Sequence, residues 1–173
     1  MTVQLSTPEV VTRAARPYVG IGAPVTMGSI SDVVPALLGE VMAWAEDHAD
    51  PAGPPFVRYL VIDMERALVL EVGVPVRAPV PEPVPTGRVE PGLLPAGQYL
   101  LATHTGPFDR LVEATGRLLA WAAEHRLELD AWETDEGQAW SARLEHYPTD
   151  PVVQPDPARW ETVLELRLAD VSP

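Results

Sequence analysis

The chain of 173 residues has neither cysteine nor lysine, only two phenylalanines and no long apolar run. The lack of cysteine excludes disulfides, thiol chemistry and thiolate metal sites, so any catalytic group must carry oxygen or imidazole. No stretch approaches the roughly 18 consecutive apolar residues of a membrane helix. The N-terminus also lacks the basic start and apolar run of a secretion signal, and we therefore expect a cytoplasmic protein without membrane contact.

Basic charge is scarce as well. Twenty-five acidic residues stand against twelve arginines, which gives a formal net charge of −13 at pH 7. A protein that binds DNA by neutralising phosphates needs a basic face, whereas these arginines are scattered along the chain. We expect no direct contact with nucleic acid and favour neutral or cationic partners, although the acidity can equally serve only to keep the surface soluble.

The sequence contains the same order of predicted secondary-structure elements twice. Hydrophobic periodicity predicts an extended segment, an amphipathic helix and two more extended segments in each half. The first set comprises 10–23, a helix through Val34–Ala45, 56–63 and 68–76, and the second comprises 93–105, 109–127, 139–147 and 160–168. Five prolines between Pro75 and Gly87 favour an extended connection between the halves.

This pattern predicts a single α+β domain over residues 1–173. A first β-α-β-β module spans about 9–76, a proline-rich bridge 77–88, and a second module about 89–169. Pseudo-twofold pairing of the two modules would form a cradle with a central groove, which is where a ligand would bind.

Alternation along 139–147 divides the candidate site residues between two faces. Trp140, Leu144 and His146 point one way, and we expect that set to pack on the helix. Glu145 and Tyr147 point the other way, into the groove. A mostly apolar groove would raise the pKa of Glu145 and make it a cation partner or a general acid/base. The alternative is that Glu145 pairs with Arg143 on an exposed face.

The histidines and aromatic residues supply further candidates. His48, His104, His125 and His146 show no ligand spacing, so we expect no metal. His104 precedes the Gly106–Pro107 turn and either lines the groove or supports that turn. The five tryptophans and four tyrosines suit a pocket for planar or cationic molecules, and they suit an ordinary core equally.

Five segments together resemble the GyrI-like small-molecule-binding domain, which is also the effector-binding half of MerR- and AraC-type multidrug-sensing activators. They are E-V-G-V-P-V (71–76), L-P-A-G-Q-Y (94–99), H-T-G-P-F-D (104–109), L-E-H-Y-P-T-D-P (144–151) and W-E-T-V-L-E-L-R-L (160–168). The resemblance covers about Glu9 to Ala169. It implies a pseudo-twofold cradle in which the acid at Glu145 faces the pocket. Phe108 stands where the family usually has tyrosine.

The resemblance implies three functions. The first hypothesis is a stand-alone binding protein for lipophilic, often cationic drugs or toxins, with Glu145 countering positive charge and Tyr59, Trp140, Tyr147, His104 and Phe108 lining the site. The second is hydrolysis of cyclopropane-type genotoxins, with Glu145 as general acid/base and Tyr147 orienting the substrate. The third is protein contact with gyrase or a regulator. None of them requires a cofactor.

Overall fold

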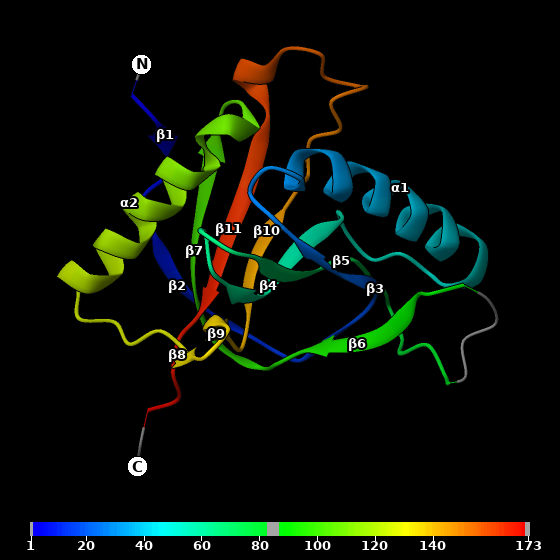
Figure 1. Cartoon of the computed structure of the whole chain (residues 1–173), viewed down its shortest axis with the longest axis horizontal. Helices are drawn as coiled ribbons and strands as arrows, with labels where there is room; N and C mark the ends of the chain where they lie inside the picture. The colour runs from blue at the N-terminus through cyan, green and yellow to red at the C-terminus, as the bar shows by residue number, and fades with distance from the viewer. Residues whose placement is uncertain (1, 83–86, 172–173) are drawn as a thin grey trace.

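The computed structural model describes residues 2–82 and 87–171, so residues 83–86 of the expected bridge lie outside the described residues. Figure 1 shows two helices packed on one curled antiparallel sheet. The helices are α1 (Ile30–His48) and α2 (Leu111–Glu124), with short 3₁₀ turns η1 (Phe108–Arg110) and η2 (Pro157–Arg159). The strands are β1 (Gln4–Leu5), β2 (Glu9–Arg13), β3 (Arg16–Val25), β4 (Phe56–Ile62), β5 (Leu68–Pro75), β6 (Glu90–Leu94), β7 (Gly97–Thr105), β8 (Ala131–Thr134), β9 (Gly137–Trp140), β10 (Arg143–His146) and β11 (Glu161–Arg167).

The two predicted β-α-β-β units are present and form one continuous sheet. The first is β3-α1-β4-β5 and the second is β7-α2-β10-β11. The central order of strands is β7-β11-β10-β4-β5-β3, so β4 and β10 pair in the middle and equivalent strands follow on both sides. The predicted pseudo-twofold α+β architecture is therefore confirmed, and its axis passes between β4 and β10.

Each of the two expected first strands is in fact a pair of strands. The segment 10–23 breaks at Ala14–Ala15, and 93–105 breaks at Pro95–Ala96. In both cases the short leading strand pairs at the far end of the sheet, because β2 pairs with β7 and β6 pairs with β3. A two-residue link joins opposite ends of a sheet only if those ends lie close together. The sheet therefore curls into a half-barrel, which hydrophobic periodicity within a strand cannot indicate.

Both faces of the curled sheet are largely buried. On the helix face, α1 packs over a cluster that includes Val19, Leu70 and Val72, and α2 packs over a cluster that includes Leu100 and Leu164. The stripe of α1 predicted from the sequence supplies Val34, Leu37, Val41 and Ala45, whereas Met42 is exposed. The opposite face encloses Tyr18, Phe56, Leu94 and Leu144.

A buried carboxylate holds the β2–β3 link against this opposite face. Glu165 of β11 is only 1% exposed. It accepts hydrogen bonds from Arg16 at 2.5 Å and from His146 at 2.9 Å, and Arg13 approaches it at 3.4 Å. Burial opposes the ionisation of Glu165, but these hydrogen bonds and charges outweigh it and lower its pKa to about 2. The ionised carboxylate therefore ties the first module to the second.

We predict that Glu165→Gln destabilises the fold at neutral pH. The pKa of Glu165 is lower when folded than its ordinary value of 4.5, so its contribution is fully present above pH 4.5 and is lost as the pH falls toward 2. A shift of this size corresponds to a free energy of unfolding on the order of 3 kcal/mol. Urea denaturation of both proteins at several pH values measures the difference, which should shrink between pH 4.5 and 2.

The matched control is Glu40→Gln, because Glu40 pairs with Arg88 on the exposed surface. Its free energy of unfolding should change by less than about 0.5 kcal/mol. A difference between wild type and Glu165→Gln that stays constant down to pH 2 would contradict the assigned role of the ionised carboxylate.

Candidate functional site

Glu145 lies on the helix face of the sheet, between the two helices. In the middle of the sheet it pairs with Val57 of β4 on one side and with Leu164 of β11 on the other. Directly paired residues in an antiparallel sheet place their side chains on the same face. Val57 belongs to the hydrophobic cluster under α1, and Leu164 belongs to the cluster under α2. Tyr147 packs against both clusters.

The expected assignment of faces was wrong for every one of these residues except Trp140. Glu145 and Tyr147 were expected on the face away from the helices, and they lie on the helix face instead. Leu144 and His146 do not pack on a helix: Leu144 joins the cluster on the opposite face, and His146 binds Glu165 there. The physical reason is a break at Ser141–Ala142, where the Ser141 N–H donates to the carbonyl of Asp130 and β9 ends before β10 begins. Alternation restarts after the break. Trp140, in the cluster under α2, therefore shares the helix face with Glu145.

Two tyrosine hydroxyls hold the Glu145 carboxylate. The Tyr147 hydroxyl donates to Oε2 at 3.0 Å, and the Tyr59 hydroxyl also contributes a hydrogen bond. Burial raises the pKa of Glu145, and these hydrogen bonds together with the attraction of Arg143 and His104 offset it only in part. Burial and the nearby carboxylate also raise the pKa of both tyrosines well above the usual value. Ionisation of Glu145 is thus less favourable than that of an exposed glutamate.

Aromatic rings lie beside Arg143 and beside Tyr147, the neighbours of this carboxylate. The guanidinium carbon of Arg143 lies 5.0 Å from the centre of the Trp140 ring and 5.8 Å from that of Tyr59. The exposed Phe108 ring meets Tyr147 edge-on at 5.6 Å and lies 4.7 Å from Trp160. Trp160 was not among the residues expected at the site, although it opens one of the segments that carry the family resemblance. Rings of this kind offer flat apolar surface and attract cations.

His104 is buried on the helix face beside this group. Its Nδ1 lies 3.2 Å from the carbonyl oxygen of Gln4, and its Nε2 lies 3.3 Å from that of Pro107. The ring thereby supports the turn at Gly106, whose φ of 140° is one that side chains rarely adopt. Its charge still lowers the pKa of Glu145. His104 therefore both supports the turn and lies close to the candidate site.

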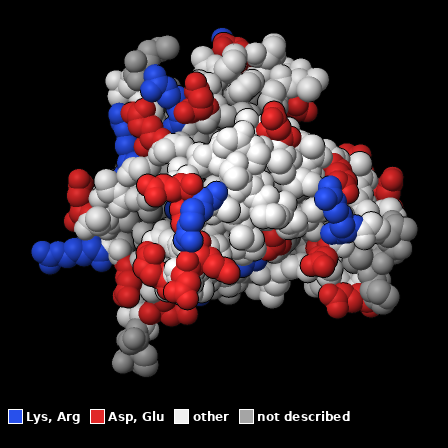
Figure 2. Space-filling view, in the orientation of Figure 1, with Lys and Arg blue, Asp and Glu red and all other residues white. Residues whose placement is uncertain are grey.

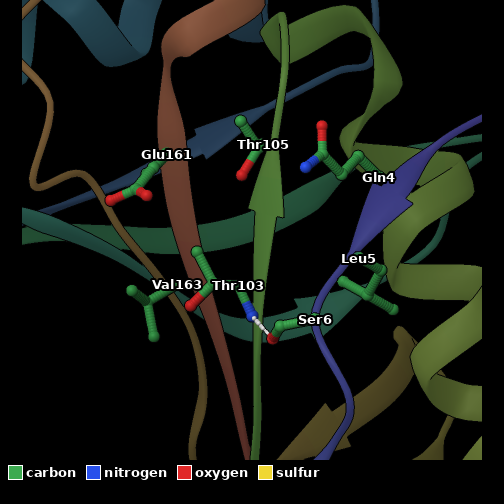
Figure 3. A pocket seen from close by; sticks show the side chains of 7 residues that line it. All are labelled: Gln4, Leu5, Ser6, Thr103, Thr105, Glu161 and Val163. Atoms are coloured by element: carbon green, nitrogen blue, oxygen red, sulfur yellow. Dashed lines mark hydrogen bonds between the residues drawn. The ribbon is translucent and has the colours of Figure 1, made fainter.

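A separate hollow of about 310 Å³ lies on the opposite face, at the end of the sheet where β1, β7 and β11 meet. Figure 3 shows its lining, which comprises Gln4, Leu5, Ser6, Thr103, Thr105, Glu161 and Val163. Its side chains Gln4, Ser6 and Glu161 are exposed, so they remain hydrated. The partly buried carboxylate with its tyrosines and rings is a more distinctive environment, and we take the helix face around Glu145 as the candidate site.

Across residues 2–82 and 87–171, no three His, Asp or Glu side chains are grouped to hold a metal ion. The same ranges contain no helix that is both long and apolar enough to cross a bilayer.

Solved structures share this fold. Two of them contain EcmrR. The structure of its C-terminal domain is similar to this chain with a TM-score of 0.68 and 18% identity, covering 99% of this chain and 100% of that one. In the EcmrR–DNA complex the TM-score is 0.69 at 19% identity, with 95% of this chain covered, and the match spans 58% of the EcmrR chain. SAV2435, solved with tetraphenylphosphonium, has a TM-score of 0.60 and 10% identity, covering 98% and 94% of the two chains.

A hydrolase from Listeria innocua is also similar, with a TM-score of 0.58 and 16% identity over 94% of this chain and 91% of that one. At these identities the likenesses establish the fold. No curated protein matches the sequence. The family model described as the GyrI-like small molecule binding domain matches residues 6–167. The chain therefore belongs to the GyrI-like family of small-molecule-binding domains.

Proposed function

We propose that the chain binds amphipathic aromatic molecules, including lipophilic cations, on the helix face between α1 and α2. The observation that carries this proposal is the partly buried carboxylate of Glu145, whose pKa is raised among aromatic rings. The carboxylate attracts Arg143 but forms no ion pair with it among the described residues, and a cationic ligand supplies a direct counter-charge. SAV2435, a protein of the same fold, was solved bound to tetraphenylphosphonium.

The surrounding side chains suit this class of ligand. Tyr59 and Tyr147 contact Glu145, Trp140 contacts Arg143 and Phe108 contacts Tyr147, and the burial of apolar ligand surface against these rings supplies most of the affinity. The cation then gains from the carboxylate and from the negative faces of the rings. His104 fixes the turn that precedes Phe108, which keeps one wall in place.

The surface charge favours the same partners. Figure 2 shows acidic side chains distributed over the visible face, with fewer basic ones among them. A net charge of −13 raises the local concentration of cations and repels phosphate backbones. We therefore expect small molecules and not nucleic acid as direct partners.

A second candidate function is hydrolysis of a strained electrophile at the same site. It is favoured by the raised pKa of Glu145, which suits a general acid/base, and by the hydrogen bond that aligns Tyr147 with it. One protein of the same fold is described as a hydrolase. Replacement of Glu145 by glutamine should then abolish turnover of cyclopropane-containing substrates, and retained turnover would rule the mechanism out.

We predict that Glu145→Gln weakens the binding of tetraphenylphosphonium. Loss of a charge-assisted contact in a partly desolvated site corresponds to about 1.5–3 kcal/mol, or roughly a 10- to 100-fold rise in Kd. Neutral triphenylphosphine oxide should bind both proteins with similar affinity, because it has no positive charge to lose. Isothermal titration calorimetry measures both ligands.

The matched control is Glu161→Gln, which removes a carboxylate from the hollow on the opposite face. Its Kd for tetraphenylphosphonium should equal that of the wild type. If Glu161→Gln weakens binding and Glu145→Gln does not, the ligand site lies in the hollow and the proposal is wrong.

We also predict that affinity for tetraphenylphosphonium rises with pH through the raised pKa of Glu145. Below that pKa the cation must displace a proton from the carboxyl group, and above it the carboxylate is already ionised. Titrations at a series of pH values from 4.5 upward, in buffers of different ionisation enthalpy, should reveal proton release that disappears as the pH rises through this pKa.

The groups that face Glu145 are Tyr59, Tyr147, Arg143 and His104. Glu145→Gln keeps all four, so any pH dependence that remains in this variant belongs to them. Equal pH dependence in the two proteins would show that Glu145 does not titrate in the binding equilibrium.

A further inference from the structure

Arg143 differs from the other arginines that are partly or fully buried in the sheet. Arg16 binds Glu165, Arg58 binds the Tyr18 hydroxyl and the Ser141 carbonyl, and Arg167 binds Asp130 and Asp170. Within residues 2–82 and 87–171, no hydrogen bond or ion pair of Arg143 with a protein acceptor is formed. Its contacts are instead the faces of Trp140 and Tyr59.

The guanidinium of Arg143 belongs to the candidate site and has no protein acceptor among the described residues. Arg143 is partly buried, and its guanidinium carbon lies over the rings of Trp140 and Tyr59. Its donors form no hydrogen bond with the described residues, so water or a ligand accepts from them. The Glu145 carboxylate attracts this guanidinium but forms no ion pair with it, and it accepts hydrogen bonds from the hydroxyls of Tyr147 and Tyr59.

The two charges are displayed side by side on one strand. Arg143 and Glu145 are separated by one residue of β10, so their side chains point to the same face about 6.5–7 Å apart along the strand. That separation is close to the width of one aromatic ring system. The planar fork of a guanidinium matches a carboxylate in two parallel hydrogen bonds. A lipophilic cation without an acceptor group leaves the donors of this guanidinium unpaired, and its charge is repelled by the positive charge of Arg143.

We propose that Arg143 is a specificity-determining residue that selects aromatic zwitterions, in which a carboxylate or similar acceptor accompanies the cationic group, over lipophilic cations that lack one. The inference rests on the proposed function, since it names the class of ligand for the same site. Arg143 binds the acceptor, Glu145 binds the cationic group, and the rings of Trp140 and Tyr59 bind the aromatic frame between them.

A matched pair of fluorescent dyes tests this assignment. Rhodamine 110 carries a free carboxylate on a cationic aromatic frame, and rhodamine 123 is its methyl ester, so the two differ only in the acceptor charge. Fluorescence anisotropy gives Kd for both. We expect the wild type to bind the acid about tenfold more tightly than the ester, which is the contribution of one charge-assisted contact.

The variants separate the two charged groups. Arg143→Met retains the apolar contact with Trp140 and should abolish or reverse the preference for the acid, whereas Arg143→Lys should retain part of it. Glu145→Gln should weaken both dyes to a similar extent, because both are cationic. Arg88→Met, which changes an exposed arginine paired with Glu40, should leave both Kd values unchanged. Thermal unfolding of each variant establishes that it is folded.

The possible failures are distinguishable. If the wild type binds the two dyes equally, or prefers the ester, the role of Arg143 is overturned while binding itself still supports the proposed function. If Arg143→Met keeps the full preference for the acid, the acceptor site lies elsewhere. If neither dye nor tetraphenylphosphonium binds the wild type, the proposed function fails and the inference fails with it.

Discussion

The antiparallel pairing of β4 with β10 is the contact on which the rest of the structure depends. It joins the two β-α-β-β modules into one sheet and sets Glu145 opposite Val57 at the pseudo-twofold axis. Side chains on the helix face at this axis lie between the clusters of α1 and α2, so they contact both cores without being enclosed fully by either. A polar group in this position is partly desolvated, which accounts for the raised pKa of Glu145.

Contacts on the opposite face of the sheet hold the two ends of the sheet together. The short links after β2 and β6 draw the sheet ends together, and the Glu165 carboxylate fastens the first of these links through Arg13 and Arg16. The two buried acids therefore differ in their surroundings. Glu165 is compensated by two arginines and a histidine and has a lowered pKa, whereas Glu145 receives only hydroxyls in direct contact and has a raised one. The first is suited to stabilising the fold, and the second is the group that we propose for ligand binding.

Much of the architecture could be predicted from the sequence, because it depends on local periodicity. The apolar stripe from Val34 to Ala45 and the doubled β-α-β-β order follow from spacing alone. The exchange of β2 and β6 between the sheet ends could not be predicted, because it depends on the curl of the whole sheet. The break at Ser141–Ala142 could not be predicted for a similar reason. The Ser141 N–H donates to the carbonyl of Asp130, which belongs to a different segment of the chain. Because of this break, Leu144 lies on the face opposite to the expected one, and Arg143 lies on the same face as Trp140.

A crystal structure of the chain with tetraphenylphosphonium is the most direct test of our proposal that ligands bind on the helix face at Glu145. We predict that the cation lies between α1 and α2, with Glu145 as its nearest carboxylate and with rings of Tyr59, Trp140 or Tyr147 against its phenyl groups. A cation found in the hollow lined by Thr103 and Thr105, or bound only to exposed acids, would contradict it.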